Sequence, residues 1–156
     1  GYFVSRLVDN IREKRGYTYS PFAVINVRDG DAYWVQTADV TSSVTGASIR
    51  EIFKEIDLLR KTAPSQEELD SVKMGFVGRY IIRLGTRDGA LNWEQFVDFY
   101  GLPADTDMIA AVRAVTPDDI RRMARKYIDP ARLTMVVVGD GKTVLSQLKG
   151  IARIRK

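Results

Sequence analysis

The sequence predicts an α+β domain, with an antiparallel or mixed sheet covered by helices mainly on one face. Three observations support this prediction. Two β-prone runs flank an Asp-Gly turn, several later segments repeat apolar residues at helical spacing, and residues 133–138 form an apolar run typical of a central strand. The length of 156 residues suits a single domain, residues 1–156, with a substantial core.

The composition is that of a folded globular chain. Hydrophobic residues make up 45% and charged residues 28%, which argues against disorder. The net charge of +4 is mild, and the basic residues are interspersed with acids except in the tail at residues 153–156. We therefore expect no nucleic-acid partner, which would need a concentrated basic face, and no apolar run reaches the length of a membrane span.

The chain contains neither histidine nor cysteine. A zinc site would have to use carboxylates alone, and a histidine general base cannot exist. We therefore expect no catalytic zinc on this chain. The lack of cysteine leaves the compartment open between cytoplasm and periplasm.

Residues 20–27 and 32–38 have strand patterns joined at residues 28–31. Asp-Gly between β-prone runs is a strong hairpin signal. In the second run Trp34 alternates with Tyr33 and Val35. We interpret Trp34 as a packing residue, with the wall of a peptide chamber as the alternative.

Helices follow the hairpin. Residues 47–61 carry an apolar stripe, residues 62–64 break it, and Ser65 with Glu68 forms a capping box for a helix that continues to Leu84. A third helix ends near Tyr100, and a short one is expected over residues 105–113.

We interpret the acidic residues at positions 118, 119 and 140 as structural. Thr116 caps a helix with Pro117 at its first position, so Asp118 and Asp119 favour the helix dipole rather than a metal. The Gly-Asp-Gly turn at residues 139–141 precedes a last helix, and it lacks the lysine and spacing of a phosphate loop.

The most specific residues lie at the first helix-to-strand junction, residues 10–21. Leu7, Val8 and Ile11 recur at helical spacing, and Gly16 stands where a left-handed helix stop would fall. That geometry would hold the guanidinium of Arg12 near the phenol of Tyr19 at the start of the strand. Taken alone, such a pair can also be structural, because an Arg in a last helical turn favours the helix dipole and a Tyr at the start of a strand is ordinary β packing.

The junction resembles a known signature. Ser5-Arg6-Leu7 followed by residues 11–19, IREKRGYTY, is similar to the C-terminal-type domain of the insulinase/pitrilysin-like (inverzincin) metallopeptidases. The runs at residues 65–69, 100–103, 115–119 and 136–140 also resemble that family, in the family's order. The family's zinc signature, His-x-x-Glu-His, is missing, as this half of the peptidase implies.

The resemblance implies roles for two residues. In the family an Arg and a Tyr, seven residues apart, reach across a closed chamber and hold the peptide substrate beside a zinc ion. By position these are Arg12 and Tyr19, whereas Tyr17 has no implied role. The zinc is expected on a separate N-terminal-type domain, in the same polypeptide or another subunit. The chain alone is then inactive and forms part of a zinc-dependent metalloendopeptidase.

The resemblance also implies a domain that lacks its first strands, since a strand, a helix and another strand would precede Ser5 in the family. Two further functions stay open. One is a noncatalytic structural or assembly subunit of the same fold. The other is a general protein-binding module, which the basic balance favours without any clustered patch.

Overall fold

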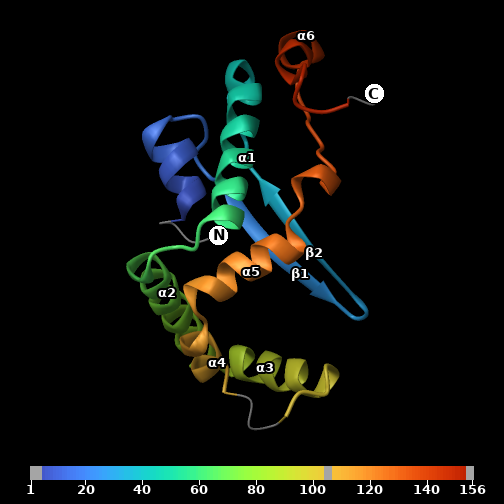
Figure 1. Cartoon of the computed structure of the whole chain (residues 1–156). Coiled ribbons are helices and arrows are strands. Elements are labelled where there is room, and N and C mark those ends of the chain that lie inside the picture. The colour runs from blue at the N-terminus through green and yellow to red at the C-terminus, as the bar shows by residue number, and fades with distance from the viewer. Residues whose placement is uncertain (1–4, 104–106, 154–156) are drawn as a thin grey trace. The chain divides into compact units, whose positions relative to one another are not determined.

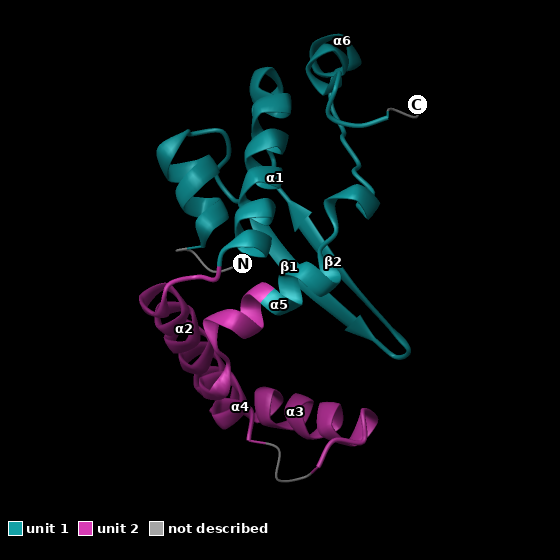
Figure 2. Cartoon of the chain, viewed as in Figure 1, with its two compact units in different colours: residues 1–62, 122–156 teal, residues 63–121 magenta. Residues whose placement is uncertain are grey.

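A computed structural model describes residues 5–103 and 107–153 of the chain. The predicted α+β class is confirmed, with helices as the main component and a small antiparallel sheet (Figure 1). The chain divides into two compact units, residues 1–62 with 122–156 and residues 63–121 (Figure 2). Each unit is described by itself.

The sheet of the first unit is the predicted hairpin. Strand β1 (Phe22–Arg28) pairs antiparallel with β2 (Asp31–Thr37), from the Phe22↔Thr37 pair to the Arg28↔Asp31 pair. Gly30 in the turn has φ +73°, a backbone angle that glycine adopts without a steric penalty. Within the described residues the sheet contains these two strands.

The predicted central strand at residues 133–138 is wrong. The segment is not part of any ladder in the described chain, and it lies across a hollow of about 540 Å³ from β2 and helix α1 (Thr45–Lys61). A strand needs a neighbour that supplies hydrogen bonds, and an apolar β-prone sequence does not provide one. Trp34 is half-buried and lines the same hollow.

Helix α1 organises the rest of the first unit. The helical segment η1 (Val8–Lys14), wound as a π-helix, lies beside α1 (Figure 1). The C-terminal pieces α6 (Gly141–Val144) and η4 (Leu145–Leu148) are tied to the start of α1 by Gln147, whose side chain accepts from the Gly46 amide at 3.1 Å. The short turns η2 (Ser42–Val44) and η3 (Pro130–Arg132) complete the unit.

Helix α5 (Pro117–Tyr127) crosses the boundary between the units. Its predicted cap is present, because the Asp119 amide donates to Thr116 Oγ1 at 3.2 Å, while Asp119 Oδ2 accepts from the Thr116 amide at 3.0 Å. Asp118 pairs with Arg121 at 2.9 Å. Helix capping and this ion pair account for both acids, as the sequence predicts.

The second unit consists of helices around α2 (Gln66–Leu84), which contacts α3 (Arg87–Phe99) and α4 (Met108–Ala114). Ser65 caps α2 as predicted, accepting from the Glu68 amide at 3.1 Å. The predicted start of the short fourth helix at Asp105 lies outside the described residues. A row of aromatic rings joins α2 to α3, made by Phe76, Tyr80, Trp93, Phe96 and Tyr100.

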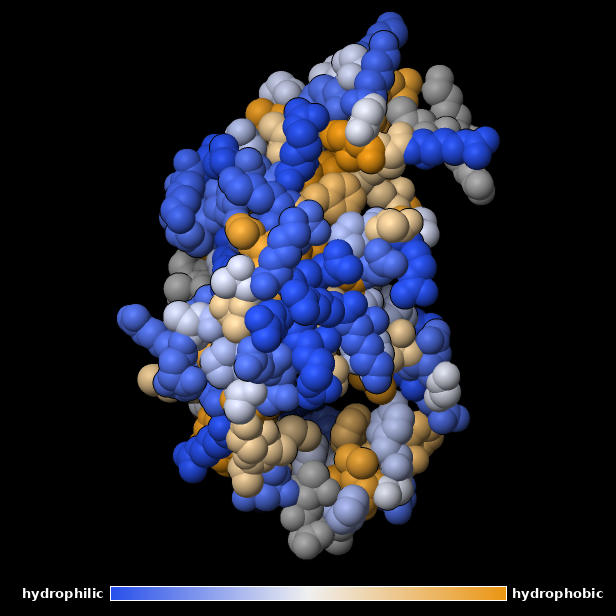
Figure 3. All heavy atoms as spheres, in the orientation of Figure 1, coloured by the Kyte–Doolittle hydropathy of each residue, from blue (hydrophilic) through white to orange (hydrophobic). Residues whose placement is uncertain are grey.

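Apolar burial is modest. The buried apolar residues of the described chain are Val8, Ile11, Ile56, Leu69, Val97, Ala124, Val144 and Leu148. Many large apolar side chains stay exposed, and hydrophobic residues show between hydrophilic ones on the face drawn in Figure 3. Two of these buried residues, Val8 and Ile11, belong to η1, which also bears Arg12 of the predicted site.

Candidate functional site

The helix-to-strand junction has the predicted conformation. Gly16 has φ +63° and follows η1, and its amide donates to the Arg12 carbonyl at 2.9 Å. The Tyr17 amide donates to the Ile11 carbonyl at 2.8 Å. This left-handed stop turns the chain out of the helical segment and toward β1.

Arg12 and Tyr19 come together at this junction. The guanidinium carbon of Arg12 lies 4.7 Å from the centroid of the Tyr19 ring, within cation–π distance. Arg12 Nε also pairs with Glu13 at 3.3 Å. The Tyr19 side chain is 78% exposed, so its hydroxyl is open to an incoming group.

The strand side of the site is fixed by Thr18. Its backbone forms an isolated antiparallel bridge with Val40, and its hydroxyl donates to the Asp39 carbonyl at 2.6 Å. The Thr41 amide donates to the Tyr17 carbonyl at 3.3 Å. These bonds tie the residues before Tyr19 to the chain that leaves β2.

The helical side is fixed by residues that the sequence patterns did not single out. Asn10 Nδ2 donates to Glu51 Oε2 at 3.0 Å and to Glu55 Oε1 at 2.5 Å, while Arg15 Nη2 pairs with Glu51 Oε1 at 2.8 Å. The hydrogen bond from Asn10, together with the nearby charges of Arg15 and Lys54, lowers the pKa of Glu51 against the opposing effect of burial. A signal was available, because Glu51 and Glu55 are two like charges one turn apart on α1.

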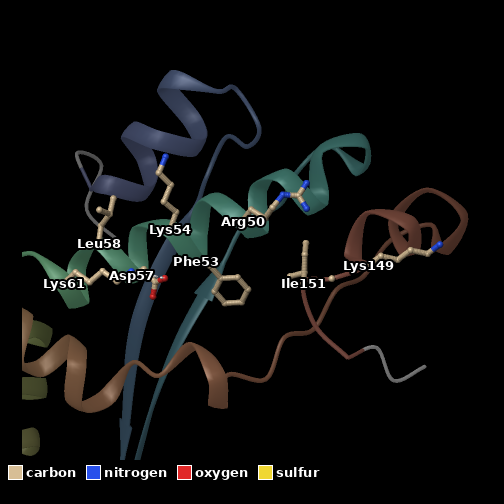
Figure 4. A pocket seen from close by; sticks show the side chains of 9 residues that line it. Arg50, Phe53, Lys54, Asp57, Leu58, Lys61, Lys149 and Ile151 are labelled. Atoms are coloured by element: carbon tan, nitrogen blue, oxygen red, sulfur yellow. Dashed lines mark ion pairs between the residues drawn. The ribbon is translucent and has the colours of Figure 1, made fainter.

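A second hollow, of about 520 Å³, lies between α1 and the C-terminal segment (Figure 4). Its lining is mixed, with Arg50, Phe53 and Lys61 on α1 and Ile151 opposite. Figure 4 shows the Lys149 side chain extending away from α1, so the cations do not converge on one point. We assign no chemistry to this hollow.

No described group of His, Cys, Asp or Glu residues could hold a metal ion. In the part of the chain that the structure describes, no helix is both long and apolar enough to cross a membrane. The Gly-Asp-Gly turn is a helix cap, since Asp140 accepts from the Lys142 amide at 3.2 Å and from Thr143 Oγ1 at 2.8 Å.

The part of the chain that contains this junction is similar to a known protein family. Residues 1–76, which include η1, the junction and the hairpin, match the model of the peptidase M16 inactive domain. The resemblance to the C-terminal-type domain of the insulinase-like metallopeptidases is confirmed. Arg12 and Tyr19 both lie inside the matched residues.

The fold is also similar to a solved structure. The crystal structure of a peptidase M16 inactive domain from Pseudomonas fluorescens matches with a TM-score of 0.71 and 22% identity, covering 83% of this chain and 31% of that one. The chain thus spans about a third of the length of that protein. None of the curated proteins compared with the chain matches it.

Proposed function

We propose that the chain is the substrate-holding and chamber-closing half of a zinc metallopeptidase. In this proposal Arg12 and Tyr19 contact a peptide bound at a zinc ion that a separate N-terminal-type domain holds. The observation that supports it is the approach of Arg12 to the exposed Tyr19 ring, at 4.7 Å, in a junction that matches the M16 inactive domain.

The chemistry gives each residue a task. Zinc-assisted peptide hydrolysis passes through a tetrahedral oxyanion, and a donor placed at that oxygen is worth about 3 to 4 kcal/mol. The Tyr19 hydroxyl is a neutral donor on an exposed side chain, and the Arg12 guanidinium offers a planar set of donors to a peptide carbonyl. The cation–π contact with Tyr19 holds that guanidinium over the ring.

A second candidate is a noncatalytic structural or assembly subunit of the same fold. The observation that favours it is the pairing of Arg12 with Glu13 at 3.3 Å, because a guanidinium that is already engaged has fewer donors to offer a substrate. The two candidates agree on the fold and differ in what Tyr19 does.

Turnover by the complex with the N-terminal-type domain separates them. Tyr19→Phe removes one donor with little loss of packing, so the proposal predicts a fall in kcat of about 10² to 10³ with a small change in KM. Tyr17→Phe, which changes a neighbouring tyrosine, is the matched control and should leave kcat unchanged. Wild-type turnover by a folded, assembled Tyr19→Phe complex would favour the structural subunit.

A further inference from the structure

The starting observation is a pair of like charges that α1 places side by side. Glu51 and Glu55 are one helical turn apart, a spacing at which two carboxylates repel each other. Both reach the same side-chain amide, that of Asn10, at 3.0 and 2.5 Å. The two carboxylates thus share one donor group on η1. We call the set of Asn10, Arg15, Glu51 and Glu55 the clamp, because it joins η1 to α1.

The Asn10 side chain is at the centre of the clamp, and both its nitrogen and its oxygen form hydrogen bonds. Asn10 is 8% exposed, donates both amide hydrogens to the glutamates, and accepts from Arg15 Nε at 2.9 Å. Arg15 in turn pairs with Glu51 at 2.8 Å. Every polar group of the Asn10 side chain is therefore satisfied, which is what a buried amide requires.

The clamp brackets Arg12 in the sequence. Asn10 comes two residues before it and Arg15 three residues after it. Burial of Val8 and Ile11 presses η1 onto α1, but apolar contact has no preferred direction. Hydrogen bonds do have one, so the clamp determines how the segment is rotated about its own axis.

We propose that Asn10 and Arg15, held by Glu51 and Glu55, are positioning residues that aim Arg12 at Tyr19. Thr18 provides the matching anchor on the other side through its bond to the Asp39 carbonyl at 2.6 Å. With both sides tied, the approach of 4.7 Å between guanidinium and ring is set before any substrate arrives. Its consequence for catalysis rests on the proposed function, whereas the geometric consequence does not.

The geometry is tested on the isolated chain by NMR. The Arg12 Hε resonance should be displaced by the ring current of Tyr19 and return toward its normal position in a Tyr19→Leu reference variant. Asn10→Ala and Arg15→Gln should each lose most of this displacement. Asp9→Asn is the matched control, because it breaks the Asp9–Lys14 pair on the same segment without touching α1, and should keep the displacement.

Unchanged amide resonances of strands β1 and β2 show that a variant is still folded, since the hairpin belongs to the same unit as Asn10 and Arg15. A folded Asn10→Ala or Arg15→Gln chain that keeps the Arg12 displacement would overturn the positioning role. Equal loss in the Asp9→Asn control would overturn it as well, because any change in η1 would then have the same effect.

Turnover with the N-terminal-type domain provides the second readout. Arg15→Gln should lower kcat by about tenfold with little change in KM, because a misaimed group loses rate more than affinity. A lost Arg12 displacement with wild-type kcat would refute the proposed function and leave the positioning role in place. A retained displacement of the Arg12 Hε resonance refutes the positioning role, whatever the value of kcat.

Discussion

Two regions of the first unit both carry large apolar side chains and differ in how these are packed. At the η1–α1 contact Ile11 is fully buried, and a closed set of hydrogen bonds surrounds Asn10. In the hairpin Ile25 is 66% exposed, and beyond it Val138 on the extended segment is 93% exposed. Burial therefore follows from the presence of a partner element, and β-prone sequence alone does not produce it.

The difference bears on function, because a group that must be aimed needs a rigid support. Hydrogen bonds and apolar contacts hold η1, where Arg12 lies, on α1. The hairpin supplies the strand that follows Tyr19 and leaves most of its own apolar side chains open. The following changes test that contrast.

The largest expected effect is on the buried isoleucine. Ile11→Ala empties a fully buried site and should cost about 2–5 kcal/mol, whereas Ile25→Ala should change the free energy of unfolding by less than about 0.5 kcal/mol. Urea denaturation of the two variants measures both. Equal losses would show that the two regions do not differ as described.

The second effect concerns charge in the clamp. Glu51→Gln should cost about 1–2 kcal/mol at pH 7, because it removes charged hydrogen bonds to Asn10 and Arg15. Glu94→Gln, on an exposed glutamate of the other unit, should be neutral. A loss of stability in Glu94→Gln as large as in Glu51→Gln would contradict the assignment.

The same clamp has a predictable pH dependence. The folded pKa of Glu51 lies below its ordinary value of 4.5, held down by Asn10, Arg15 and Lys54, with Glu55 also facing Asn10. A depressed pKa stabilises the fold above the unfolded pKa, and the gain is lost as the pH falls through the folded pKa. As the pH falls from neutral to below 4.5, Glu51→Gln should therefore lose less stability than the wild type. Parallel curves would exclude a contribution from Glu51.

A pair of glycines gives an effect of similar size on stability, with different consequences for the site. Gly16 and Gly30 both have positive φ, at +63° and +73°, and an added Cβ would meet no atom within 4 Å at either. Alanine at each should cost about 1–2 kcal/mol from backbone strain alone. Only Gly16→Ala should also shift the Tyr19 ring signals, because Gly16 links η1 to the strand. Ring signals that move equally in Gly30→Ala would oppose that link.

The smallest effect is on local opening. The Tyr17 amide, bonded to the Ile11 carbonyl at 2.8 Å, should exchange its hydrogen at least about tenfold more slowly than the paired amides of β1. Native-state hydrogen exchange reads both. Slower exchange in β1 would reverse the assignment of rigidity.

Much of the fold was predictable because its signals are local. The Asp-Gly turn, the Ser65 and Thr116 caps and the left-handed stop at Gly16 each depend on a few neighbouring residues. The prediction of a strand at residues 133–138 was wrong because pairing requires the edge of a second strand. Nothing in residues 133–138 themselves indicates whether such an edge is near.

The candidate site divides in the same way. The approach of Arg12 to Tyr19 followed from a helix stop between them, which the sequence shows. The clamp could not be predicted in this way, because Asn10 and Glu55 are 45 residues apart and meet only when η1 lies on α1. Only the like-charged spacing of Glu51 and Glu55 hinted that a donor would come between them.

The central claim is that Arg12 and Tyr19 act together on one bound peptide, and a double-mutant cycle on kcat/KM tests it most directly. Arg12→Lys keeps the charge and loses the planar fork, Tyr19→Phe loses the hydroxyl, and the complex with the N-terminal-type domain carries each change singly and together. The account predicts that both single changes lower kcat/KM and that the double change lowers it by less than the product of the two. Wild-type kcat/KM in the single variants, or losses that multiply fully, would contradict joint action at one substrate group.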